Sequence, residues 1–112
     1  MKRTDNDRLR EALLHLDALH RHLERQDLAD ETVADAVSLR LASAIETLRT
    51  TDGELETRLF GADWGRIWAT RHHIARGYAF VSQDLIQETI RFNLPDFERT
   101  LRSELDKLDT PD

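Results

Sequence analysis

Residues 5–26, DNDRLREALLHLDALHRHLERQ, decide the fold class of this chain. Apolar side chains recur in this stretch at steps of three and four residues, which places them on one face of an α-helix. Thr4 or Asp5 can cap the N-terminus of that helix. The stretch therefore predicts one amphipathic arm of a helical bundle, with a stripe made of Leu9, Ala12, Leu13, Leu16, Leu19 and Leu23.

The next part of the chain continues in the helical period. A second apolar stripe predicts a helix over about 28–49. Thr51–Glu54 resembles a capping box that opens a short helical segment, and Phe60–Gly61 ends it. These signals indicate two further helical elements before residue 61.

The C-terminal half predicts three more helical segments. Asp63 is a suitable cap and Gly77 a suitable stop for a helix over 64–76. Ser82 can cap the next helix, and Pro95 stands at a natural first-turn position of the last. Because no segment alternates with the period of a strand, the sequence predicts an all-α fold, an antiparallel bundle of four to five helices.

Composition narrows the class of protein further. The 112 residues predict a single domain, 1–112. Cysteine is absent, which excludes disulfides and thiolate chemistry. No signal peptide is expected, and no apolar run exceeds four residues, so we expect a cytoplasmic protein without a membrane span. No histidine spacing points to a metal site, and no cofactor is expected.

Residues 64–83, WGRIWATRHHIARGYAFVSQ, contain no carboxylate although the protein is acidic. Three arginines give this window a charge of +3. The remainder of the chain therefore carries −9, since the net charge is −6 with neutral histidines. A cationic segment on an anionic protein is a natural contact for a phosphate-bearing partner.

The three arginines of the window are not equivalent. At about 100° per residue, Arg71 lies in the middle of the apolar face of the 64–76 helix. An arginine there needs partners. It can extend to solvent, pair with Glu46 of the second helix, or serve a functional site. Arg66, His72, His73 and Arg76 fall on the other side, where the histidines are either solvated side chains or parts of a site.

The run Trp64–Tyr78 resembles the signature helix of HepT-like proteins, a branch of the HEPN ribonuclease superfamily. That signature is approximately Trp-x-x-Ile-x-x-x-Arg-Asn-x-(apolar)-x-His-x-Tyr. The positions that match at the expected spacing are Trp64, Ile67, Arg71, Ile74 and Tyr78. The stretch 41–46 and the region 84–97 are similar to other parts of the family.

The resemblance implies a homodimer that cleaves RNA without metal, with arginine and histidine meeting in the dimer cleft. It also implies a partner, a minimal nucleotidyltransferase antitoxin, that silences the toxin by adding AMP to Tyr78. Two positions depart from the pattern, because His72 replaces an asparagine and Arg76 replaces the motif histidine. Arg76 can bind phosphate but cannot shuttle protons, since a guanidinium stays protonated.

Three functions follow from this comparison. In the first, Arg71 and His72 retain ribonuclease chemistry, Arg76 holds phosphate, and Arg66 and His73 bind RNA. In the second, the domain has lost catalysis and serves as the regulatory partner of the nucleotidyltransferase. In the third, the chain is a helical interaction module, and Tyr78 is an ordinary packed tyrosine.

Overall fold

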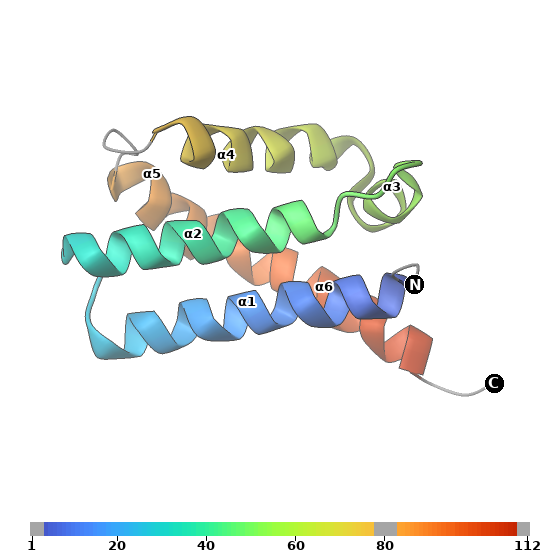
Figure 1. The fold of residues 1–112 in the computed structure, drawn as a ribbon, viewed down its shortest axis with the longest axis horizontal. Coiled ribbons are helices and arrows are strands. Elements are labelled where there is room, and N and C mark those ends of the chain that lie inside the picture. Colours follow the sequence, from blue (N-terminus) through green and yellow to red (C-terminus); the bar gives the residue numbers. More distant parts are fainter. Residues whose placement is uncertain (1–3, 78–82, 110–112) are drawn as a thin grey trace.

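The computed structural model describes residues 4–77 and 83–109, and every regular element within them is helical. The all-α prediction is therefore confirmed. Figure 1 shows α1, α2 and α4 side by side, with α5 and α6 behind them. The elements are α1 (Asp5–Arg25), α2 (Glu31–Thr47), α3 (Glu54–Phe60), the 3-10 turn η1 (Gly61–Asp63), α4 (Trp64–Gly77), α5 (Gln83–Glu88), the π-helix η3 (Thr89–Asn93) and α6 (Leu94–Asp109).

Capping residues set the bounds of the first two helices. Thr4 and Asp7 form a reciprocal capping box that starts α1, where the sequence predicted a start. The second helix begins three residues later than predicted, because the carboxylate of Asp30 accepts from the backbone N–H of Val33 at 3.2 Å. The carboxylate of Asp27 accepts from Ala29 N–H at 2.9 Å, which holds the preceding residues in a turn.

The predicted capping box at Thr51–Glu54 is wrong. Gly53 precedes α3 with a left-handed φ of 74°, and the carboxylate of Asp52, not the hydroxyl of Thr51, accepts from the backbone N–H of Glu54 at 3.1 Å. The carboxylate of Glu56 instead accepts from the backbone N–H and the hydroxyl of Thr50. Gly61 has a φ of 54° and ends α3, which confirms the predicted break.

The last two predicted helices form one continuous rod in the structure. The chain passes from α5 through the π-helix η3 into α6, and Leu94 N–H donates to the carbonyl of Thr89, five residues back. The prediction that Pro95 lies in the first turn of the last helix is confirmed, because α6 begins at Leu94, although the chain enters α6 without a break. Proline lacks an N–H and its ring crowds the carbonyl four residues earlier, so a locally widened turn lets the rod continue.

One apolar core joins these helices. Each fully buried leucine or isoleucine contributes roughly 1.5–3 kcal/mol relative to an exposed side chain. Ion pairs on the surface add smaller contacts, such as that between Arg10 of α1 and Asp109 of α6 at 2.7 Å. The largest fully buried side chains come from five helices and one connection and are Leu9, Leu16, Leu19, Val37, Ile45, Leu48, Leu55, Ile86 and Leu101.

The helix α2 occupies the centre of the layer seen in Figure 1, where it packs against α1 on one flank and α4 on the other. Within the described residues, no helix is long and apolar enough to cross a membrane. Because α2 lies between α1 and α4, each of its two flanks faces a neighbouring helix. Arg40 lies on the flank toward α1, and Glu46 lies on the flank toward α4.

Candidate nucleic-acid interface

The cationic helix α4 is anchored by its apolar face. Ile74 is buried, and Trp64, Ile67 and Trp68 pack against the main core. The ring of Trp64 stacks on Phe60 with their centroids 6.0 Å apart. This arrangement confirms the predicted face and fixes which polar side chains of α4 reach solvent.

Arg71 lies on this apolar face, as predicted, and contacts α2. Its Nη2 atom is 3.0 Å from Oε2 of Glu46, the partner that the sequence suggested. Its guanidinium carbon lies 4.9 Å from the centroid of the Trp68 ring. The Glu46 side chain is 60% exposed, and an ion pair in such a setting is worth only about 0–1 kcal/mol.

The ion pair leaves one donor of Arg71 unsatisfied. Its Nε atom is buried and has no hydrogen-bond partner among the described residues. A buried donor without a partner costs on the order of 1–3 kcal/mol. An oxyanion that accepted from both Nε–H and a terminal N–H would remove that cost, and two oxygens of a phosphate can bind a guanidinium group in this way.

A second arginine contacts the same indole ring. The guanidinium carbon of Arg49 is 4.8 Å from the Trp68 centroid, just after the end of α2. The sequence interpretation missed Arg49. The available signal was its position three residues after Glu46, which places both on one flank of a helix. Trp68 therefore holds two cationic groups beside the α2–α4 contact.

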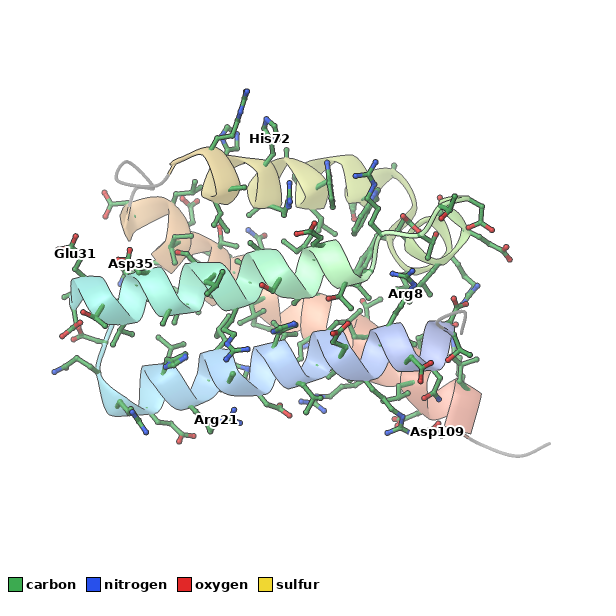
Figure 2. All side chains as sticks on the ribbon, viewed as in Figure 1. Arg8, Arg21, Glu31, Asp35, His72 and Asp109 are labelled. Carbon is green, nitrogen blue, oxygen red and sulfur yellow. The ribbon has the colours of Figure 1, made fainter. Side chains whose placement is uncertain are left out.

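His72 follows Arg71 in sequence but points elsewhere. Its side chain is exposed and extends from α4 away from the other helices (Figure 2). Successive helical residues point about 100° apart, so Arg71 faces α2 while His72 faces solvent. Neither His72 nor its neighbour His73 contacts another described residue by an ion pair or hydrogen bond.

The remaining predicted residues lie on the outer side of α4. His73 and Arg76 are exposed. Arg66 is also exposed and lies 3.4 Å from Asp63 in an i,i+3 ion pair. Tyr78, the predicted AMP acceptor, lies outside the described residues. Within one protomer the structure therefore does not bring Arg66, His73 or Arg76 to Arg71.

Arg66 also lines a cavity beside α4. This cavity has a volume of about 250 Å³ and lies between α2, α3, α4, η3 and α6. Apolar side chains such as Leu41 and Phe97 line it together with polar groups that include Thr70 and Asn93. No three His, Asp or Glu side chains within 4–77 and 83–109 come together in a way that could hold a metal ion.

These features define an all-α bundle that carries one carboxylate-free cationic helix on an acidic body. A family model described as Ribonuclease HepT-like matches residues 9–104. Because the match covers most of the 112 residues, the chain belongs to the HepT-like ribonuclease family. No curated protein and no solved structure matches the chain.

Proposed function

We propose that this protein is the toxin component of a nucleotidyltransferase/HEPN toxin–antitoxin pair, and that it acts as a metal-independent endoribonuclease. One observation carries the proposal. Arg71 is held against α2 by a weak, replaceable ion pair, and the exposed imidazole of His72 follows it on the same carboxylate-free helix. Membership of the HepT-like ribonuclease family supports RNA as the substrate.

In the proposed reaction, the phosphorus of an RNA phosphodiester passes from the 5′-oxygen of one nucleotide to the neighbouring 2′-oxygen. The 2′-oxygen attacks phosphorus, the bond from phosphorus to the 5′-oxygen breaks, and the products are a 2′,3′-cyclic phosphate and a 5′-hydroxyl. One imidazole accepts the proton of the 2′-hydroxyl and a second gives a proton to the 5′-oxygen, because imidazole exchanges protons near neutral pH. Arg71 stabilises the charge on the phosphorane.

A homodimer supplies the second imidazole. When two copies of α4 face each other, a phosphate between them can meet the His72 imidazole of each protomer together with the Arg71 guanidinium of one. Arg76 then binds the substrate phosphate in place of the family histidine, and Arg66 and His73 contact RNA outside the reacting centre. Tyr78 accepts AMP from the cognate nucleotidyltransferase antitoxin, in the cytoplasm.

The test is cleavage of RNA by the purified protein in the presence of a chelator. We expect Arg71→Ala and His72→Ala each to lower the cleavage rate by about 100-fold or more. Arg76→His, which restores the family motif, should raise it. Full cleavage by the Arg71→Ala/His72→Ala double variant would refute the proposed chemistry, and an unmodified Tyr78 after co-expression with the antitoxin would refute the AMP transfer.

A second function is favoured by a specific observation. Arg71 is already paired with Glu46, and Arg76 stands where the family has its histidine, so the domain fits a catalytically degenerate partner that binds and regulates a minimal nucleotidyltransferase. Expression of the protein alone separates the two functions. Arrested growth with RNA breakdown supports the ribonuclease, whereas normal growth with retained antitoxin binding supports the regulatory partner.

A further inference from the structure

A second cationic surface lies away from α4, on the other flank of α2. Three arginines line a groove of about 520 Å³ between α1 and α2. Arg21 and Arg25 come from α1 and Arg40 from α2. The carboxylate-free window does not include this surface, and the sequence interpretation assigned it no role.

The α1 wall of the groove is a single helical stripe. Ala18, Arg21, His22 and Arg25 recur at steps of three and four, so they share one face of α1. Ala18 is small and buried, and it lines the groove between the longer side chains. Arg21 extends into solvent from this helix (Figure 2). The stripe thus lines a hollow with long cationic side chains.

Arg40 closes the groove from α2. Its Nη1 atom lies 3.1 Å from Nδ1 of His15, and because Arg40 has only donors, the imidazole nitrogen is the acceptor. This bond fixes one terminal nitrogen of the guanidinium group in a partly buried position. Arg40 is therefore held in place by a neutral group.

The charge of the groove is not balanced locally. Most other arginines that the structure describes contact a carboxylate, as Arg58, Arg99 and Arg102 do. In contrast, no carboxylate of 4–77 or 83–109 lies within 4.0 Å of Arg21, Arg25 or Arg40, although Glu24 also lines the groove. The partial negative charge at the C-terminus of α1 stabilises the cation of Arg25, which is in the last turn of that helix. It does not account for Arg40 in the middle of α2.

We infer that the α1–α2 groove binds the phosphate backbone of single-stranded RNA through Arg21, Arg25 and Arg40. Planar guanidinium forks match phosphate oxygens and are well suited to bidentate contacts. The net charge of −6 repels a polyanion, so RNA needs local cationic contacts of this kind. The inference rests on the proposed function for its choice of RNA, and it adds a contact surface outside the reacting centre.

The test compares two variants of equal charge. Arg21→Gln/Arg25→Gln removes two groove arginines, and Arg10→Gln/Arg99→Gln removes two arginines that are already paired with Asp109 and Asp96. The probe is a fluorescein-labelled single-stranded RNA with 2′-O-methyl riboses, which cannot be cleaved by the 2′-hydroxyl. Dissociation constants are measured by anisotropy across about 50–200 mM salt.

We expect the groove variant to lose about 1.4 in the slope of log affinity against log salt, since each phosphate contact on a single strand is worth about 0.7. The paired-arginine variant should keep the wild-type slope. Equal slopes for all three proteins would overturn the inference. So would displacement of the probe by polyglutamate as readily as by unlabelled RNA, because the groove would then fit an acidic protein segment.

Cleavage of unmodified RNA separates this inference from the proposed function. If both hold, the groove variant cleaves at the wild-type rate when RNA is saturating and needs more RNA to reach that rate. If neither the wild type nor either variant cleaves while the slopes differ as expected, the ribonuclease proposal fails and the inference that the groove binds RNA is retained. If the wild type cleaves and the slopes are equal, the groove fails and the ribonuclease proposal stands.

Discussion

Glu46 of α2 and Arg71 of α4 join the two helices through an ion pair of 3.0 Å, and the arginine simultaneously covers the indole of Trp68. The arginine side chain is 24% exposed and the glutamate side chain is 60% exposed. The pair is therefore reachable from solvent, and a phosphate has to compete with Glu46 for the same guanidinium group.

Replacing Glu46 by glutamine should strengthen RNA binding. The variant keeps the shape of the side chain and removes the competing charge, so we expect affinity for single-stranded RNA to rise about two- to fivefold, the equivalent of a surface ion pair. Asp35→Asn is the matched control, since Asp35 is an exposed carboxylate on the same helix. An equal gain in both variants would mean that only the net charge matters.

Trp68 should stabilise the fold through its ring face. Trp68→Ala removes a partly buried indole that two arginines cover, and we expect the free energy of unfolding to fall by about 2–3 kcal/mol. Trp68→Phe keeps a ring in place and should cost less than half as much. Urea denaturation followed by circular dichroism measures both, and equal losses would show that the cationic contacts contribute nothing.

Two glycines should respond in opposite directions to alanine. A methyl group at Gly61 or Gly65 would meet no atom within 4 Å beyond the adjoining residues and the backbone of its own helix. Gly61 has φ 54° and ψ −128°, which an L-residue tolerates poorly, so Gly61→Ala should cost about 1–3 kcal/mol. Gly65 lies within α4, where alanine should add about 0.5–1 kcal/mol. A thermal unfolding midpoint that fell in both variants would contradict the assignment of α4.

Arg58 links three helices and should act mainly through charge. It contacts Asp5 of α1 and Glu104 of α6, each at 3.0 Å. Because its side chain is 40% exposed, we expect Arg58→Met to cost no more than about 1 kcal/mol in low salt. The difference from wild type should shrink in high salt, where exposed charges are screened.

The pH dependence of the Arg58 contribution follows from its pKa. The hydrogen bond to Asp5 is the largest cause that raises the pKa of Arg58 above its ordinary value, with Glu104 adding to it. A raised pKa gives a contribution that is complete below the unfolded pKa and is lost only as pH rises through the folded pKa. The stability difference between wild type and Arg58→Met should therefore stay constant from about pH 6 to pH 10. If the stability difference disappeared within this range, a titratable group other than Arg58 would be responsible for it.

Much of the fold could be predicted because apolar periodicity reports directly on buried faces. The stripe from Leu9 to Leu23 and the apolar face around Arg71 both lie where the periodicity placed them. The Arg71–Glu46 pair could be anticipated because an arginine on an apolar face needs a carboxylate within reach.

The errors arose where several local signals compete. Thr51–Glu54 matched a capping pattern, but Gly53 has a left-handed backbone and the carboxylate of Glu56 bonds Thr50. The groove of Arg21, Arg25 and Arg40 could not be predicted, because it depends on how α1 and α2 are rotated against each other. The roles of His72 and Arg76 stay predictions, since a second protomer would have to complete the site.

The π-helix corrects the phase of the long C-terminal rod. Ile86, Ile90 and Leu94 are spaced by four, and in a regular α-helix each step would drift by about 40° around the axis. A turn with more residues cancels that drift, so the core-facing stripe continues into Phe97 and Leu101. Deleting one exposed residue of this turn, such as Phe92, would place Ile86 and Leu94 seven residues apart, a spacing that a regular α-helix keeps on one face to within about 20°. The segment is thus the place where the rod can lose one residue and keep its inner face, whereas the same deletion within the regular turns of α6 would rotate the following residues by about 100°.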